Sequence, residues 1–226
     1  MIHRNLHSDA DVCVDTLKSG MRAKHGFAVT AILAAPPRLI WCTITGFGLT
    51  SDRAGYDFVV QAEQGWMAIT GEPNGAPMKV GVALADVVAG KDACIAILAA
   101  LVARGKSNRG RHVTVSLAAS ASAALVNVAQ NALVSRAEPK RWGNAHPNLV
   151  PYQLFEASDR PLVIAVGNDA QWSACARSLG PEALANDLRL RPHAGRIPEP
   201  HRGLTTTAAR IPDAPAAPRR GPPDAA

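Results

Sequence analysis

The sequence predicts an α/β protein with a parallel sheet, followed by a smaller region with a hairpin and by a disordered C-terminal tail. Apolar runs at 38–43 and 112–117 are separated by helical patterns, which is the spacing of parallel crossover units. The runs YQLFEA (152–157) and PLVIAV (161–166) flank Ser-Asp-Arg, a hairpin pattern. Eight of the last 38 residues are proline and no period of 2 or 3.6 persists there, so we expect that segment to be disordered.

The first part of the chain predicts two strands and a ligand-binding turn. Residues 10–17 (ADVCVDTL) have the pattern of a short buried strand, and 19–35 are helical or irregular up to Pro36-Pro37. The run 38–43 is the next strand, and Gly-Phe-Gly follows at 46–48. A strand, a glycine turn and a carboxylate at a later helix start are the parts of a ligand site in an α/β protein.

Two helices are expected before the strand at 112–117. The first covers 57–67, a Gly/Pro-rich loop occupies 70–82, and the second helix begins near Asp86 and ends at 104–105. Helical spacing predicts an apolar face on each: Phe58, Val59, Ala62 and Trp66 on the first, and Ile95, Leu98, Ala99 and Val102 on the second.

Two more helices are expected, at 118–134 and at 169–179, the latter ending before Gly180-Pro181. We therefore divide the chain into a large domain (1–137), a small domain (138–188) and a tail (189–226).

Composition and charge exclude some classes of protein. The chain is 47% hydrophobic and 19% charged, which is ordinary for a globular protein. Its net charge of +6 is concentrated in the tail, where seven arginines face three acids. Because the rest of the chain carries only +2 and shows no nucleic-acid motif, we expect no nucleic-acid binding. No segment is apolar enough for a membrane span, and the N-terminus has no apolar secretory segment.

The cysteines give no metal or disulfide framework. Cys13, Cys42, Cys94 and Cys175 lie far apart, without a CxxC or a Cys/His pair at metal spacing. Cys42 and Cys94 sit in apolar runs, where buried free thiols are expected. We therefore expect no metal site and a cytoplasmic location.

Asp86 has two interpretations that periodicity cannot separate. An Asp before an apolar run is an ordinary helix N-cap. Alternatively, the helix N-terminus holds the carboxylate ionised, and an ionised carboxylate can act as a nucleophile.

An ordered set of motifs resembles one family. The segments ITGFG, AGYDFVVQAEQG, ITGEPNG, MKVGV, ADVVAG and GNAHPNLVPYQ follow one another between about Ser8 and Leu188, and together they resemble the class III CoA-transferases. This resemblance implies a Rossmann-like large domain, a small domain and two interlocked chains. It also implies that Asp86 attacks an acyl-CoA thioester, giving a mixed anhydride and then an aspartyl-CoA thioester, from which a carboxylic acid takes CoA. Coenzyme A would be a substrate, and no other cofactor is implied.

The resemblance also implies CoA contacts. The turn Thr45, Gly46, Phe47 and Gly48 matches a CoA-binding turn of the family, although glycines also serve simply to make turns. Lys24 falls where the family often has a basic residue near a CoA phosphate, with a solvated lysine as the alternative. An Asn-Phe pair that contacts CoA in the family is Thr16-Leu17 here.

Two further positions concern the second substrate. The loop AHPNLV (145–150) lacks the glycine run of formyl-CoA transferase and is similar to relatives that use succinate or glutarate. His146 in that loop could contact a substrate carboxylate or be structural. Lys79, just before Asp86, could pair with the distal carboxylate of a dicarboxylic acid, contact a CoA phosphate or lie in solvent.

Two alternatives to CoA transfer remain. Racemases of the same superfamily use a His at the position of Tyr56, and a tyrosine does not readily exchange a proton near neutral pH, which disfavours racemisation. The chain is also shorter than the family at both ends, lacking the first βαβ unit, and it ceases to resemble the family after Leu188. A non-catalytic fragment or a pseudoenzyme is therefore the main alternative.

Overall fold

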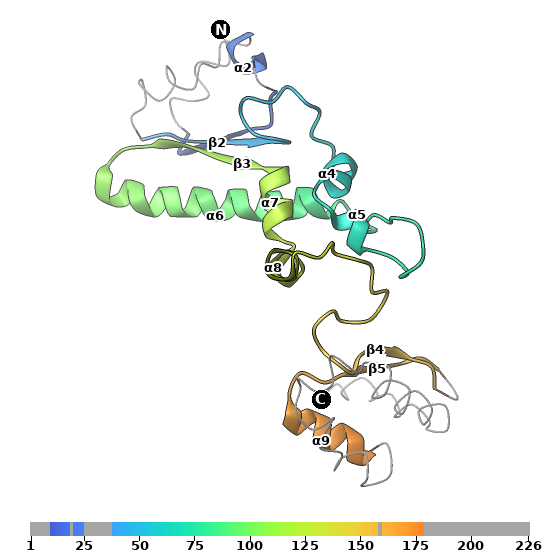
Figure 1. Ribbon diagram of the computed structural model, residues 1–226. Helices are drawn as coiled ribbons and strands as arrows, with labels where there is room; N and C mark the ends of the chain where they lie inside the picture. Colours follow the sequence, from blue (N-terminus) through green and yellow to red (C-terminus); the bar gives the residue numbers. More distant parts are fainter. Residues whose placement is uncertain (1–9, 19, 25–37, 158–159, 179–226) are drawn as a thin grey trace, which may run out of the picture. The chain divides into compact units, whose positions relative to one another are not determined.

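The computed structural model describes residues 10–18, 20–24, 38–157 and 160–178 (Figure 1). The chain divides into two compact units, Met1–Arg141 and Trp142–Ala226. The tail predicted to be disordered, and most of the irregular segment predicted before Pro36, lie outside the described residues.

A parallel three-stranded sheet is the centre of the first unit. Its strands are β1 (Val12–Asp15), β2 (Ile40–Thr45) and β3 (Arg111–Ser116), in the order β1-β2-β3. Both pairs are parallel, with Val12 opposite Ile40 and Ile40 opposite Arg111. The expected strands are therefore correct, as is the parallel crossover from β2 to β3. β1 is less buried than expected, because it lies at the edge of this sheet and Val14 is 51% exposed.

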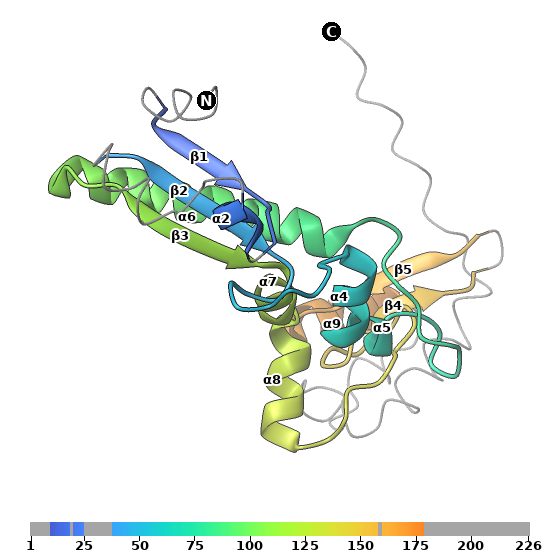
Figure 2. The same cartoon turned by 90° about the horizontal axis from the view of Figure 1, so that it is seen from above.

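The long helix α6 (Leu84–Ser107) contacts β2 and β3 and runs along one face of the sheet (Figures 1 and 2). Its predicted apolar face is wrong: Ile95, Leu98 and Val102 are 65%, 56% and 71% exposed. The buried apolar residues of α6 are instead Ala85, Ala89, Ala93 and Ala100. Alanines spaced by four or seven residues form one stripe, and their small side chains let the helix approach the sheet closely.

The predicted helix at 57–67 is two shorter helices, α4 (Asp57–Glu63) and α5 (Trp66–Ile69). They are separated at Gly65, whose φ of 85° lies in the left-handed region that glycine readily adopts. Because the chain turns there, Trp66 does not share a face with Phe58 and Val59. Phe58 and Val59 are exposed, and α4 buries Val60 and Gln61 instead.

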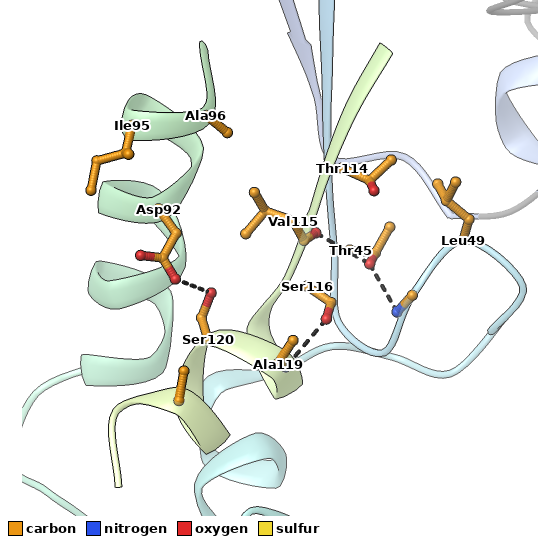
Figure 3. A pocket seen from close by; sticks show the side chains of 12 residues that line it. Thr45, Leu49, Asp92, Ile95, Ala96, Thr114, Val115, Ser116, Ala119 and Ser120 are labelled. Carbon is orange, nitrogen blue, oxygen red and sulfur yellow. Dashed lines mark hydrogen bonds between the residues drawn. The ribbon is translucent and has the colours of Figure 1, made fainter. Parts of the chain in front are cut away.

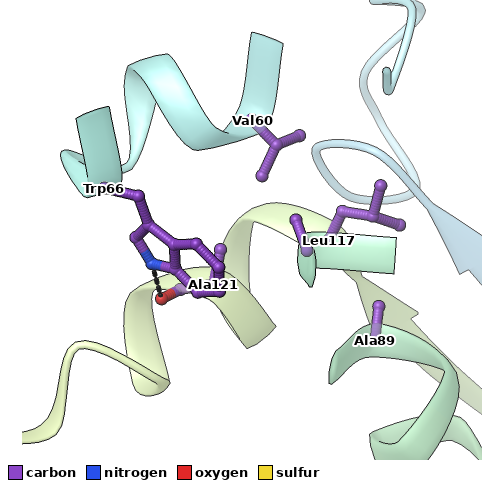
Figure 4. Packing of buried hydrophobic residues seen from close by; sticks show 6 residues of the cluster. Val60, Trp66, Ala89, Leu117 and Ala121 are labelled. Atoms are coloured by element: carbon purple, nitrogen blue, oxygen red, sulfur yellow. Dashed lines mark hydrogen bonds between the residues drawn. The ribbon is translucent and has the colours of Figure 1, made fainter. Parts of the chain in front are cut away.

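A hydrophobic cluster joins α4, α5 and α6 to the helix α7 (Leu117–Ala123) (Figure 4). Trp66 lies in it and donates a hydrogen bond from Nε1 to the Ala121 carbonyl at 2.8 Å. The buried members are Val60, Trp66, Ala85, Ala89, Leu117 and Ala121. This cluster fixes the N-terminal part of α6 against α4 and α7, which is the part that carries Asp86.

The predicted helix at 118–134 is also broken in two. α7 (Leu117–Ala123) and α8 (Val126–Ser135) meet at a bend of 73°. Within the described residues no single helix is long and apolar enough to cross a membrane, and only this bent pair meets the criterion by length and composition.

The second unit contains a hairpin and a helix. β4 (Tyr152–Phe155) pairs antiparallel with β5 (Leu162–Ala165), as predicted. The helix α9 (Asp169–Ser178) follows, close to the predicted bounds, and buries Trp172 and Ala176 against Val166.

Candidate active site

A glycine turn leaves the carboxyl end of β2. The Gly48 amide donates to Thr45 Oγ1 at 2.9 Å, and Gly48 has a φ of 100°. Gly46 packs directly against Gly55, because a Cβ on Gly46 would lie 2.3 Å from the Gly55 Cα. The glycines are therefore required by backbone contact and by conformation, and the turn stays close to the end of the loop that leads to α4.

The start of α6 is capped by a residue from another helix. Ala83 occupies the N-cap position and offers no side-chain hydrogen bond. Asp57, the first residue of α4, accepts the Ala85 amide at 2.8 Å and the Asp86 amide at 3.4 Å through Oδ1. These are amides that a helix leaves unpaired at its N-terminus. Asp86 lies in the first turn of α6 and is not its N-cap, so the capping interpretation of Asp86 is wrong.

Asp86 lines a cavity of about 470 Å³ at the carboxyl end of the sheet. The cavity is formed by the turn after β1, the glycine turn, the loop before α4 and the start of α6. Its lining residues are Thr16, Leu17, Lys18, Ile44, Thr45, Gly46, Ser51, Arg53, Ala54, Gly55, Tyr56, Asp86, Gly90 and Leu117.

The Asp86 carboxylate is available for chemistry. Among the described residues it has no hydrogen-bond or ion-pair partner. Partial burial raises its pKa above the ordinary aspartate value, and the negative charge of Asp57 raises the pKa further. Both influences oppose the ionising effect that we expected from the helix N-terminus, and the end of the helix is occupied by Asp57.

A second cavity, of about 650 Å³, lies between β3, α6 and α7 (Figure 3). It shares Thr45 with the first cavity, and Gly48 belongs to it. Its carboxylate, Asp92, already accepts a hydrogen bond from Ser120 at 2.6 Å. This cavity is the larger, but its acid is engaged, so the cavity with the free Asp86 carboxylate is the candidate active site.

The turn after β1 is held in place by Asp15. Its Oδ1 accepts the Leu17 amide and an Arg22 Nη1–H at 3.0 and 3.1 Å. Its Oδ2 accepts Trp41 Nε1–H at 2.6 Å and Thr43 Oγ1–H at 2.7 Å. This carboxylate therefore fixes Thr16, Leu17 and Lys18, which form one wall of the cavity.

Arg53 and Lys18 are the cations that line the cavity, and sequence reasoning missed both. Arg53 forms an ion pair with Glu63 and lies 4.0 Å from the centre of the Phe47 ring. The spacing of residues gave no signal for Arg53, because Glu63 is ten residues away and Phe47 lies within the glycine turn.

The other predicted site residues are not part of this cavity lining. Lys79 is exposed on the loop before α6, with Nζ 3.4 Å from the Val80 carbonyl oxygen. Lys24, in the helix α2 (Met21–Lys24), is exposed too. His146 belongs to the second unit, where Nδ1 accepts the Asn148 amide and the ring packs against Tyr152 at 5.1 Å.

In the part of the chain that the structure describes, metal-ligating side chains and thiols do not gather into a site. Over the described ranges no group of three or more His, Cys, Asp or Glu could hold a metal ion. All four cysteines are free; Cys42 is buried as expected, but Cys94 is exposed, because it lies on the outer face of α6.

Comparison with known proteins identifies the family. Residues 1–216 match the profile of CoA-transferase family III, so the match extends past Leu188, where we expected the resemblance to end. The succinate–glutarate CoA-transferase of Agrobacterium fabrum is 43% identical, over 86% of this chain and 49% of that protein. Human succinyl-CoA:glutarate CoA-transferase is 38% identical, over 82% of this chain and 43% of that protein.

Comparison with solved structures supports the same family. A CAIB/BAIF family protein from Brucella suis is 39% identical with a TM-score of 0.74, over 95% of this chain and 57% of that chain. Rv3272 from Mycobacterium tuberculosis shares the fold, with a TM-score of 0.81 and 22% identity. The match covers 94% of this chain and 56% of that chain. The chain spans about half the length of the curated relatives it matches. It belongs to CoA-transferase family III.

Proposed function

We propose that this chain supplies the nucleophile of a CoA-transferase, which moves CoA from an acyl-CoA to a carboxylic acid through a covalent intermediate on Asp86. The observation that carries the proposal is the Asp86 carboxylate, which lines a cavity and has no partner in the described residues. The family assignment supplies the reaction class.

In the first half-reaction a carboxylate oxygen of Asp86 attacks the thioester carbonyl of the acyl-CoA. The C–S bond breaks, CoA leaves as its thiolate, and a mixed anhydride links the acyl group to Asp86. The thiolate then attacks the Asp86 carbonyl. The anhydride C–O bond breaks, the donor acid leaves as a carboxylate, and an aspartyl-CoA thioester remains.

In the second half-reaction the incoming carboxylate attacks the aspartyl thioester and displaces the CoA thiolate, forming a new mixed anhydride. The thiolate attacks the acyl carbonyl of the incoming acid, which releases its CoA ester and regenerates the Asp86 carboxylate. Lys18 places positive charge in the cavity, and Arg53 lines it while ion-paired with Glu63. Positive charge there favours the phosphates of CoA and the negative charge that develops on each tetrahedral oxygen.

We further propose that the acceptor is a dicarboxylic acid. Two relatives at 38–43% identity are named for succinate or succinyl-CoA and glutarate. Lys79 is exposed on the loop before α6, and we propose that its ammonium group pairs with the second carboxylate of the acceptor. The partners of the reaction are then an acyl-CoA and a small dicarboxylate, with a homodimer as the assembly that the family resemblance implies.

The test is covalent trapping on the full chain. Succinyl-CoA is added with hydroxylamine, which attacks the aspartyl carbonyl, displaces CoA or succinate and leaves a hydroxamate. Peptide mass mapping should find this hydroxamate on Asp86. In the Asp86→Asn variant it should disappear. Asp92→Asn is the matched control on the same helix, since an amide oxygen there still accepts from Ser120, and its labelling should equal that of the wild type.

The same preparation tests the acceptor and the alternative. With hydroxylamine left out, glutarate and succinate should discharge the aspartyl-CoA thioester, and so form their CoA esters, faster than acetate does. If Asp86→Asn is labelled as well, another residue is the nucleophile and the assignment to Asp86 is wrong. If the wild type gains no hydroxamate, the assignment is also wrong and the chain is a non-catalytic member of the family. Loss of optical activity from a 2-methylacyl-CoA would instead indicate racemisation, which Tyr56 disfavours.

A further inference from the structure

Gln61 on α4 is a fully buried polar residue whose amide orientation is determined by its neighbours. Its Oε1 accepts the Val80 amide at 2.9 Å, and a backbone N–H can only donate. The Gln61 Nε2 group must therefore point the other way, where it donates to Asp57 Oδ2 at 2.6 Å and to the Val82 carbonyl at 3.3 Å. Gln61 thus connects α4 with the loop that leads into α6.

Both carboxylate oxygens of Asp57 therefore accept hydrogen bonds. Oδ2 accepts from Gln61, and Oδ1 accepts the Ala85 and Asp86 amides. Only a carboxylate offers acceptors on both arms, because an asparagine presents one donor and one acceptor. In an Asp57→Asn protein, one N–H of the new side-chain amide would face either Gln61 Nε2 or the Ala85 amide, and one hydrogen bond would be replaced by a contact between two donors.

We propose that Asp57, oriented by Gln61, is the positioning residue for Asp86. The inference rests on the proposed function, in which Asp86 is the nucleophile. Asp57 holds the backbone of Asp86 through the helix amides, so the Asp86 side chain is not needed to cap α6 and its carboxylate stays free in the cavity. A displacement of about 1 Å at a reacting group can reduce a rate a hundredfold, so this fixation matters for the rate.

The charges around Asp86 make its pKa a second test of the proposal. Asp57 faces it from α4, while Lys18 and Arg53 line the same cavity from the turn after β1 and the loop before α4. The negative charge of Asp57 contributes to the raised pKa of Asp86. Removing that charge should therefore lower the Asp86 pKa.

The test compares Asp57→Asn with the double variant Asp57→Asn/Gln61→Glu. In the double variant the amide nitrogen at position 57 donates to the new carboxylate at position 61, which also accepts the Val80 amide, and the amide oxygen at position 57 accepts the Ala85 amide. The bonds between positions 57 and 61 and to the Val80 and Ala85 amides are restored with the negative charge moved to position 61, and only the longer bond to the Val82 carbonyl, at 3.3 Å, is lost. Both variants are made in the full chain and compared with the wild type by circular dichroism.

Three measurements are made: hydrogen exchange of the Ala85 and Asp86 amides, the pKa of the Asp86 carboxyl by NMR, and the rate of hydroxamate formation on Asp86 with succinyl-CoA. In Asp57→Asn we expect exchange and labelling to change by roughly tenfold or more, exchange faster and labelling slower, with a lower Asp86 pKa. In the double variant we expect both rates to return to within about threefold of the wild type, since the hydrogen bonds between positions 57 and 61 and to the Val80 and Ala85 amides are restored.

The outcomes separate this inference from the proposed function. If the wild type is not labelled, the nucleophile assignment fails, while exchange at Ala85 still shows whether Asp57 fixes the start of α6. If exchange and labelling in Asp57→Asn equal the wild type, the positioning role is wrong. If the double variant is as slow as the single one, the location of the charge and not the hydrogen-bond complement controls Asp86, and the proposal is overturned.

Discussion

Two glycines in α6 provide a direct test of where the ligand binds. Gly90 and Gly105 both lie inside this helix, and a Cβ at either would have nothing within 4 Å. Replacing a helical glycine by alanine stabilises a protein by about 0.5–1 kcal/mol, because the unfolded chain loses conformational freedom. Gly90→Ala and Gly105→Ala should therefore each raise the unfolding free energy by that amount.

The two sites differ in what fills the open space. Gly90 lines the cavity of Asp86 and lies one helical turn after it, whereas Gly105 is near the other end of α6. A methyl group at position 90 would therefore enter the cavity of Asp86, which is the proposed CoA site. One misplaced methyl in a binding pocket costs about 1–3 kcal/mol. We expect Gly90→Ala to bind CoA roughly tenfold or more weakly and Gly105→Ala to bind CoA like the wild type.

The assay is calorimetric titration of each full-length variant with CoA, with urea denaturation for the unfolding free energy. If Gly90→Ala and Gly105→Ala bind CoA equally well, the cavity is not the CoA site and the reasoning fails. If neither variant is stabilised, the space around the glycines is not open, and the geometry of α6 is wrong.

Two further predictions concern the support of the site. Trp66→Phe removes the buried hydrogen bond from Nε1 to Ala121 and should lower the unfolding free energy in urea by about 1–2 kcal/mol; a change below about 0.5 kcal/mol would contradict the role of this bond. Asp15→Asn leaves fewer acceptors for Leu17, Arg22 and their neighbours, so titration should show weaker CoA binding together with a loss of stability; unchanged CoA affinity would show that the turn after β1 is not a wall of the CoA site.

The order of elements could be predicted from the sequence, but the faces of the helices could not. The strands at 38–43 and 112–117 are local apolar runs, so a short stretch of sequence is enough to predict each of them. The buried face of α6 is different. Helical spacing points to Ile95 and Leu98, whereas the structure buries Ala89 and Ala93. Close approach of a helix to a sheet favours small residues at the contact. The buried alanine face therefore cannot be predicted from the spacing of the large aliphatic side chains.

Some residues of the candidate site could likewise be predicted from the sequence, and others could not. Asp86, Thr45 and Gly46 were predicted from the family resemblance, and they line one cavity. Asp57 and Arg53 were not predicted. Asp57 acts on Ala85 across 28 residues of sequence, and no periodicity spans such a separation. Contacts of this kind depend on how α4 packs against α6, so they follow from the fold and not from any one segment.

In the proposed reaction Asp57 of α4 and Asp86 of α6 have separate tasks. The unpaired amides of a helix N-terminus favour a carboxylate nearby. If Asp86 accepted these amides itself, hydrogen bonding would stabilise its ionised form, lower its pKa and reduce the basicity of the attacking oxygen. Asp57 accepts them instead. Asp86 is left with partial desolvation and a neighbouring negative charge, both of which raise its pKa, and the proposed attack on a thioester would gain from a more basic carboxylate.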